Sequence, residues 1–222
     1  MDGWNGERQI GSTLADIEEK HLERYFYAEK FSENKTILDA ACGCGYGSFI
    51  LAKKAKKVIR ADNSDDALKY GDEHYMLPNI QSVKINLEKE IPDIGLFDLI
   101  VSFETIEHLS SPLHATIKKF YDLLNTGGIL IISHPEMEKE PGYVISSTKD
   151  LLNIRKVLLA LKKIIRTSLL NDRKGYSFHV HFNINGSEVK RIFERSGFEI
   201  VDEYYQEGRF ASPYHIVTGR KK

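Results

Sequence analysis

The chain has 222 residues, enough for one large domain with a full hydrophobic core and no need of disulfides or metals to stabilise it. Its 31 basic and 32 acidic side chains give a net charge of −1, so it lacks the overall positive field of a dedicated nucleic-acid-binding protein. It has no apolar run of about 18 residues and no basic and apolar leader at its start, so we expect neither a membrane span nor secretion by that route.

Apolar runs alternate with helical patterns along most of the chain, with turn residues between them. This alternation is typical of βαβ units and predicts a parallel sheet covered by helices. Two β-rich runs near the end, at 198–205 and 214–219, have no helix between them, so we expect an antiparallel hairpin there. The predicted strands are 37–40, 57–62, 80–85, 97–103 and 128–134, and the predicted helices are 13–30, 46–55, 64–76, 112–124 and 186–196.

Residues 135–180 depart from this alternation and contain helical periodicity from Leu151 to Leu170. On a helical wheel the basic side chains gather on one side, and apolar side chains occupy the rest. Two readings stay open: a helix packed on the body with a solvated basic face, or a lid over the substrate that grips a phosphate-bearing or membrane-surface molecule. The basic residues are Arg155, Lys156, Lys162, Lys163 and Arg166.

The most informative stretch reads ILDAACGCGYGS and runs from Ile37 to Ser48. It predicts a short strand that ends in an acid, then a glycine-rich turn, then the start of a helix. Glycines at 43, 45 and 47 allow positive φ and let a ligand lie directly against the backbone. The carboxylate of Asp39 at the strand end favours a cationic ligand, because it would repel a pyrophosphate.

The only two cysteines of the chain, Cys42 and Cys44, lie in this turn. One residue between them is too short a spacing for an ordinary disulfide, and two thiols are too few for a structural zinc site. This usage indicates a reducing, cytoplasmic setting.

A second acid, Asp62, ends the second predicted strand, 17 residues beyond Gly45. In a doubly wound fold this position faces the ribose of a nucleotide cofactor, whose hydroxyls a carboxylate can bind. The spacing suits NAD and S-adenosylmethionine (SAM) equally. The dinucleotide fingerprint requires a third glycine where Ser48 stands, however, so the turn favours SAM and leaves a nicotinamide oxidoreductase as the weaker reading.

This stretch resembles motif I of the class I SAM-dependent methyltransferases, chiefly the type 11/23-like small-molecule enzymes. Residues 97–109 resemble the family's fourth motif, and 124–132 resemble its L-K-P-G-G turn with Asn125 and Thr126 in place of lysine and proline. The resemblance extends motif by motif over about residues 20–134 and more loosely over 180–220.

The resemblance implies an α/β fold with a doubly wound, seven-stranded, mostly parallel, Rossmann-like sheet. Its strand order would be 3-2-1-4-5-7-6, with an antiparallel last strand. The length predicts a single domain over residues 1–222, and we expect residues 135–180, which interrupt the alternation, to form an inserted helical lid that binds the methyl acceptor.

The same resemblance assigns a cofactor site. Asn86 would meet the adenine amino group, and Leu87 would pack on the ring. In a stretch similar to an R-Y-x-F-A helix of some relatives, the arginine, Arg24, or the tyrosine beside it would close over the cofactor carboxylate, although a surface salt bridge fits Arg24 equally well. The residues implied to bind SAM are Asp39, Ala40, Cys42, Gly43, Gly45, Asp62, Asn63, Asn86, Leu87, Phe103, Glu104, His108 and Arg24.

Methyl transfer from a sulfonium needs an aligned acceptor and no covalent enzyme intermediate. A hydroxyl acceptor would benefit from a general base, and histidine is suited to that role near neutral pH. The candidates are His108, His134 and His181, with His179 beside the last; for each of them a structural role is the alternative.

We therefore expect an enzyme that transfers a methyl group from SAM to a small-molecule or glycan-type acceptor, one that could bear a phosphate, at oxygen, with S-adenosylhomocysteine (SAH) as product and a monomer or homodimer as the assembly. The main alternative is a metal-assisted 2′-O-methyltransferase of RNA or a sugar. It rests on Glu104, Glu107, His108 and His181, which resemble the E-x-x-E-H…H metal site of small-RNA methyltransferases. A catalytically inactive SAM-binding regulatory protein is the third reading.

Overall fold

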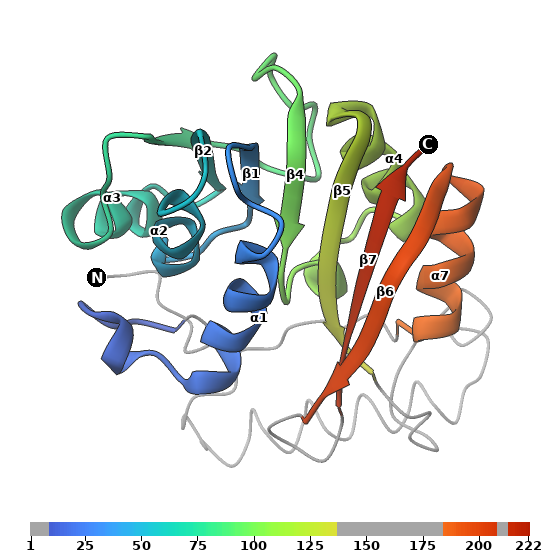
Figure 1. Ribbon diagram of the computed structural model, residues 1–222, viewed down its shortest axis with the longest axis horizontal. Helices are drawn as coiled ribbons and strands as arrows, with labels where there is room; N and C mark the ends of the chain where they lie inside the picture. The colour runs from blue at the N-terminus through green and yellow to red at the C-terminus, as the bar shows by residue number, and fades with distance from the viewer. Residues whose placement is uncertain (1–8, 137–183, 208–212) are drawn as a thin grey trace, which may run out of the picture.

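The computed structural model describes residues 9–136, 184–207 and 213–222, and over these residues seven strands form one sheet (Figure 1). The strands are β1 (Thr36–Ala40), β2 (Lys57–Asp62), β3 (Ile80–Lys84), β4 (Phe97–Ser102), β5 (Leu124–Pro135), β6 (Phe198–Gln206) and β7 (Tyr214–Lys221). Their order across the sheet is β3-β2-β1-β4-β5-β7-β6. The pairs from β3 to β5 are parallel, and β7 is antiparallel to both of its neighbours, which confirms the predicted sheet and its order.

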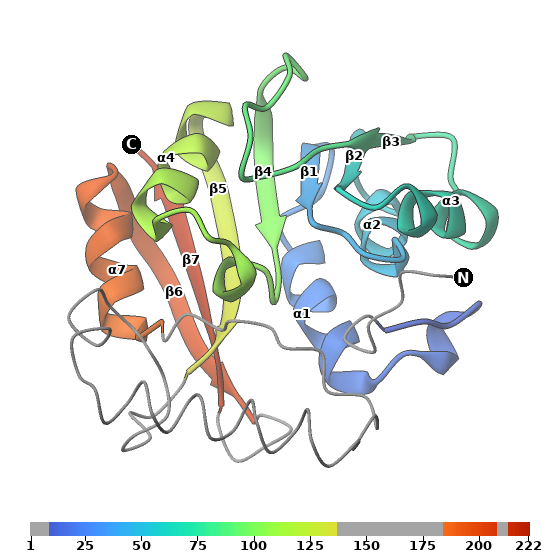
Figure 2. The same ribbon diagram turned by 180° about the vertical axis from the view of Figure 1, so that it is seen from behind.

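Helices cover both faces of the sheet (Figures 1 and 2). One face carries α1 (Glu19–Glu29), α2 (Tyr46–Ala52) and α3 (Asp65–His74), and the other carries α4 (Leu113–Leu123) and α7 (Gly186–Arg195). Two short 3₁₀ turns, η1 (Leu14–Asp16) and η2 (Ile106–His108), lie beside the strand ends.

The hydrophobic core consists of two clusters separated by the sheet. Successive side chains of a strand point to opposite faces, so Ile37 of β1 packs with Ile50 of α2, whereas Leu38 belongs to the cluster that includes Phe120 of α4. These side chains are all nearly inaccessible to solvent. The central strands are therefore apolar without alternation, as expected for a parallel sheet buried on both sides.

The predicted helix over 13–30 begins later than expected. The Asp16 carboxylate accepts hydrogen bonds from the amide and the hydroxyl of Thr13, at 2.9 Å each, which closes a single 3₁₀ turn. Ile17 follows in an extended conformation and is buried at 5% exposure, so the chain turns into the core before α1 starts at Glu19. The helical pattern at 13–18 is thus overridden by local capping and by burial of one side chain.

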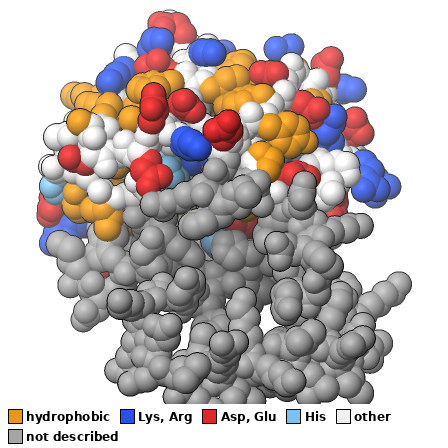
Figure 3. Space-filling model, turned by 90° about the horizontal axis from the view of Figure 1, so that it is seen from below, with side chains coloured by type: hydrophobic (Ala, Val, Ile, Leu, Met, Phe, Trp, Pro, Cys, Tyr) orange, Lys and Arg blue, Asp and Glu red, His pale blue; other side chains and the backbone are white. Residues whose placement is uncertain are grey.

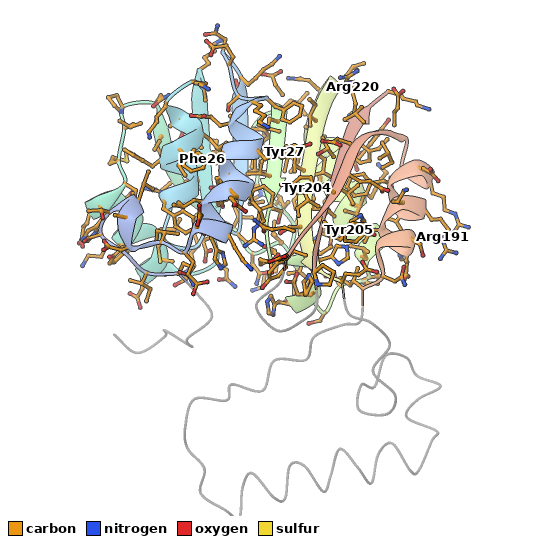
Figure 4. All side chains as sticks on the ribbon, turned by 60° about the horizontal axis from the view of Figure 1, so that its bottom comes forward. Phe26, Tyr27, Arg191, Tyr204, Tyr205 and Arg220 are labelled. Carbon is orange, nitrogen blue, oxygen red and sulfur yellow. The ribbon has the colours of Figure 1, made fainter. Side chains whose placement is uncertain are left out.

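The C-terminal hairpin is confirmed by eight paired positions between β6 and β7. Tyr27 of α1 and Tyr204 of β6 lie side by side with ring centroids 4.9 Å apart (Figure 4), so α1 also packs on the hairpin. The predicted basic helix at 151–170 and most of the proposed lid fall outside the described residues.

Candidate functional site

The glycine-rich turn joins β1 to α2 at the carboxyl edge of the parallel strands, where ligands bind in open α/β sheets. Its underside is tightly packed: a Cβ on Gly45 would lie 2.6 Å from Nη1 of Arg60, and a Cβ on Gly47 would overlap the ring of Tyr25. A Cβ on Gly43, by contrast, would meet nothing within 4 Å. The turn is therefore fixed from below and open at Gly43, which leaves room for a ligand against the backbone.

Asp39 lies beneath this turn with 1% of its surface exposed. Its carboxylate accepts a 2.6 Å hydrogen bond from the Ser48 hydroxyl and a 3.1 Å hydrogen bond from the Tyr25 hydroxyl. Burial raises the pKa of Asp39 to about 6, although the two hydroxyls and Arg60 oppose the shift. The acid thus ties the strand end to α1 and α2 and holds a negative charge under the turn.

Asp62 connects the turn to α3. Its carboxylate accepts hydrogen bonds of 2.9 Å each from the backbone amides of Gly43 and Ser64, and 4% of its surface is exposed. A carboxylate offers about four acceptor positions, so the same group can accept from more than one donor at once. Asn63, the next residue, is exposed.

Arg60, in the middle of β2, is fully buried beneath the turn, a role that the sequence pattern did not predict. Its guanidinium donates to Ser82 Oγ, to the Tyr75 carbonyl and to Asp72, and it supports the turn from below at Gly45. The sequence did contain one signal: Arg60 lies within an apolar strand that is expected to be buried. A buried charge requires fixed partners, so an arginine at this position indicates a structural role.

The predicted adenine residues follow β3. Asn86 is half-buried and forms a turn, in which its side-chain oxygen accepts a 2.9 Å hydrogen bond from the amide of Glu88. Leu87 is buried at 7% exposure within the core. Asn86 thus has the structural role of a turn residue, and its contact with adenine stays a prediction.

A second polar cluster lies where β4 and β5 end. The Ser133 hydroxyl donates a 2.7 Å hydrogen bond to the Glu104 carboxylate, and the Glu104 amide donates to the same hydroxyl at 3.1 Å. Glu104 has a positive φ of 49°, a conformation that costs free energy and recurs at functional sites. Burial raises the pKa of Glu104 even though Arg24 and Ser133 oppose the shift. Phe103, which precedes it, packs edge-on against Tyr25.

Arg24 is buried at 1% exposure, so it does not form a surface salt bridge. Its guanidinium lies 3.6 Å from the Glu104 carboxylate and 4.7 Å from the centre of the Tyr214 ring, and it donates to Gln206 at 3.2 Å. The arginine therefore joins α1 to the ends of β4, β6 and β7 at the edge where the turn opens.

The candidate histidines differ in accessibility. His134 on β5 is fully buried, its Nε2 lies 3.2 Å from Nδ1 of His215, and burial lowers its pKa to about 4. The His108 side chain is 29% exposed, with its Nε2 3.9 Å from the Glu107 carboxylate. His179 and His181 fall outside the described residues.

The proposed metal ligands of the E-x-x-E-H stretch do not converge within the described ranges. Glu104 faces Arg24 and Ser133, and Glu107 is buried at 2% exposure. In that part of the chain the group of three ligand-type side chains whose atoms all lie within 4.8 Å of one another is instead His134, Glu136 and His215. Cys42 and Cys44 are both buried, and no disulfide joins them.

The sequence also matches known methyltransferases. Residues 31–197 match the family model described as "Methyltransferase domain". A "Probable S-adenosylmethionine-dependent methyltransferase" of Mycolicibacterium smegmatis is 26% identical over 170 residues, which cover 76% of this chain and 53% of that protein. A helix long and apolar enough to cross a bilayer is not found among the described residues.

Other relatives carry names with different acceptors. A malonyl-[acyl-carrier protein] O-methyltransferase of Priestia megaterium is 30% identical over 135 residues (59% of this chain, 48% of that protein), and a tRNA U34 carboxymethyltransferase of Pseudoalteromonas atlantica is 29% identical over 129 residues (56% and 39%). The chain thus spans about half or less of the length of these curated relatives. The N-methyltransferase NodS of Bradyrhizobium japonicum, solved with SAH, shares the fold with a TM-score of 0.63 and 16% identity, over 91% of this chain and 88% of NodS.

Proposed function

We propose, because this chain belongs to the family of class I SAM-dependent methyltransferases, that it transfers the methyl group of SAM to an oxygen of a small-molecule or glycan-type acceptor. The observation that carries the proposal is the glycine-rich turn, which is open at Gly43 and has two buried carboxylates beside it. The same strand order and the same carboxyl-edge site would serve any acceptor, so the class of acceptor depends on the residues at the ends of β4 and β5.

The residues present fit this cofactor. The backbone at Gly43 leaves space for a ligand, and Asp39 holds negative charge close beneath it, which suits a sulfonium and an ammonium group better than a pyrophosphate. The Asp62 carboxylate is fixed beside the turn by the amides of Gly43 and Ser64, at the end of the second strand, where an acid can accept from ribose hydroxyls. When bound, SAM supplies an electrophilic methyl group on a positively charged sulfur, and the protein then has to align the acceptor and exclude water.

Glu104 is our candidate for the group that removes the acceptor proton. It lies at the end of β4, its side chain is 21% exposed, and burial raises its pKa towards the neutral range where a general base works best. Arg24 and Ser133 hold the carboxylate in one orientation. His108 remains an alternative base, whereas His134 is fully buried and its ring contacts His215.

An oxygen acceptor agrees with a carboxylate base, since a hydroxyl must lose a proton as it attacks. The relative named as a malonyl-[acyl-carrier protein] O-methyltransferase supports methyl transfer to an oxygen atom. The relative named as a tRNA U34 carboxymethyltransferase makes RNA the first alternative acceptor to test. Among the side chains coloured by type in the view from below (Figure 3), basic and acidic groups are interspersed with apolar ones, a mixture that suits a small polar acceptor better than a phosphate backbone.

Two measurements test the proposal in sequence. Calorimetric titration with SAM, SAH and NAD should give saturable binding of the first two, and binding of NAD alone would contradict the assignment. Incubation with methyl-labelled SAM and separate pools of sugar nucleotides, small hydroxylated metabolites, lipids and RNA should then label a small-molecule or glycan pool. Labelling confined to RNA would overturn the acceptor class while leaving the cofactor intact.

A further inference from the structure

We propose that His134, Glu136 and His215 form a binding site for one divalent transition-metal ion, of which Zn²⁺ suits the ligands best. This inference does not rest on the proposed methyl transfer. Nε2 of His134 and Nδ1 of His215 lie 3.2 Å apart, and the Glu136 carboxylate lies 4.0 Å from the latter nitrogen. In a tetrahedral zinc site with bonds of about 2.0–2.1 Å, neighbouring ligand atoms are roughly 3.3 Å apart. The two imidazoles already have this separation, the carboxylate is within about 1 Å of it from His215, and all three ligand atoms lie within 4.8 Å of one another.

Each ligand is held by a regular part of the fold. His134 and His215 are directly paired in the antiparallel register of β5 and β7, and both are fully buried. Glu136 follows β5, where its amide donates a 2.7 Å hydrogen bond to the Pro213 carbonyl. Its carboxylate accepts a 2.9 Å hydrogen bond from the amide of Gly186, the first residue of α7. The ion would therefore fasten the ends of two strands and lie beside the start of a helix.

The surroundings of the two rings determine where their protons lie. Nδ1 of His134 is 3.0 Å from the Pro135 carbonyl, which can only accept, so this nitrogen carries hydrogen and Nε2 presents a lone pair. Nε2 of His215 lies 3.8 Å from the Glu203 carboxylate, which favours hydrogen on that nitrogen and a lone pair on Nδ1. Two lone pairs then face each other across 3.2 Å, an arrangement that a cation between them would satisfy.

Without an ion, one ring has to donate to the other. His134 is fixed by Pro135, so His215 would have to donate from Nδ1 and turn the lone pair of Nε2 towards Glu203. The structure gives that buried Nε2 no hydrogen-bond partner. Lys190, which binds Glu203 at 2.8 Å, is the neighbouring positive charge, and it neutralises the carboxylate without reaching the ring.

The backbone of α7 packs closely against the ligand atoms. A Cβ on Gly186 would lie 2.5 Å from Nδ1 of His215 and 2.8 Å from the Glu136 carboxylate, so any other residue at this position would displace the ligand atoms. On the other side, the ring of Tyr205 (Figure 4) stacks on His215 with centroids 4.7 Å apart and fixes its plane. Two imidazoles and one carboxylate are a donor set typical of zinc sites that keep a fourth position for water or substrate.

The test is metal binding by the full chain after chelator treatment. Titration with Zn²⁺, and with Co²⁺ as a spectroscopic probe, should give one ion per chain with the visible absorption of a tetrahedral cobalt site. Glu136→Gln, which keeps an acceptor for the Gly186 amide, and His134→Gln should each weaken binding at least about tenfold. Glu203→Gln, which acts through His215, should weaken it about 10- to 100-fold. His114→Gln, an exposed histidine of α4, is the matched control and should bind as the parent does.

Two results would overturn the site: no saturable binding of either ion by the folded parent, or equal affinity in the parent and in Glu136→Gln. If His134→Gln does not fold, the two carboxylate variants decide, since both side chains are partly exposed. Titration of the metal-free chain with SAM, run in parallel, keeps the outcomes separate, because failure of metal binding leaves SAM binding unaffected and the reverse also holds.

Discussion

The hydroxyl of Tyr25 donates a hydrogen bond to the buried carboxylate of Asp39 across the interface between α1 and the glycine-rich turn. The ring of the same tyrosine fills the space that a side chain at position 47 would need. Tyr25 therefore stabilises the negative charge of Asp39 beneath the turn and also fixes the shape of the turn. Through this residue α1 becomes part of the proposed cofactor site.

Removal of this hydroxyl in Tyr25→Phe should lower the free energy of unfolding by about 1–3 kcal/mol, because the carboxylate loses a donor and stays buried. SAM should also bind more weakly. Denaturant unfolding and calorimetric titration measure the two effects. Tyr27→Phe is the matched control, since its hydroxyl bonds to Asp202 at the surface, and it should leave SAM affinity unchanged.

The raised pKa of Asp39 predicts a specific pH dependence of stability. With a pKa of about 6 in the folded protein against 3.8 as its ordinary value, the folded protein keeps a proton between about pH 4 and 6 that the unfolded chain has lost. The contribution of Asp39 to stability therefore falls as pH rises through this interval, by up to about 3 kcal/mol. Unfolding of the parent and of Asp39→Asn at several pH values isolates the effect, and parallel stability curves would contradict it.

Cofactor affinity should have the opposite dependence. Protonation of Asp39 below about pH 6 removes the negative charge under the turn, so the affinity for SAM should decrease as the solution becomes more acidic. Calorimetric titration between about pH 5 and 8 measures this decrease. In Asp39→Asn the affinity should be low and nearly independent of pH over the same range.

Gly47→Ala should destabilise the protein by about 1–3 kcal/mol, because the new methyl group overlaps the ring of Tyr25. If that ring is the cause, the same substitution should cost much less in a Tyr25→Ala background. A double-mutant cycle measures the coupling. Additive effects would show that the penalty arises elsewhere, for example in the backbone of α2.

Glu104→Gln tests the proposed base. Its kcat should fall about 10²-fold or more, while SAM affinity changes only a few-fold, since glutamine can still accept the Ser133 hydrogen bond. The acidic limb of the pH–rate profile should disappear with it. His108→Gln is the companion variant: loss of that limb in His108→Gln and not in Glu104→Gln would assign the base to His108.

The sheet was predictable because its signals are local. Each strand is an apolar run between turn residues, and the strand order follows from the motif resemblance. The structure confirms the predicted strands and their order. Ile17 shows where this fails: the pattern at 13–30 fits a helix, but burial of one side chain and the cap formed by Thr13 and Asp16 end the turn early. Such tertiary effects are not visible in periodicity.

The site was predictable only in part. The turn and its acids stand out because glycines and carboxylates are adjacent in the sequence. Arg60 and the pairing of His134 with His215 were not foreseen, because each depends on contacts between distant strands; the two histidines are 81 residues apart. Arg24 was recognised as a candidate, yet its burial against Glu104 and Tyr214 depends on elements at opposite ends of the chain.

The position of β7 between β5 and β6 has a consequence for how the molecule is made. β6 is synthesised before β7 but pairs with no other described strand, so it cannot join the sheet directly. During translation the five strands that precede β6 in the chain, β1 to β5, can assemble first. Until β7 is made, β6 and α7 cannot pack on the sheet and expose the apolar surface around Phe193 and Phe198. A ribosome stalled before residue 214 should therefore display a chaperone-binding nascent chain, which release of the last strand converts into the finished fold.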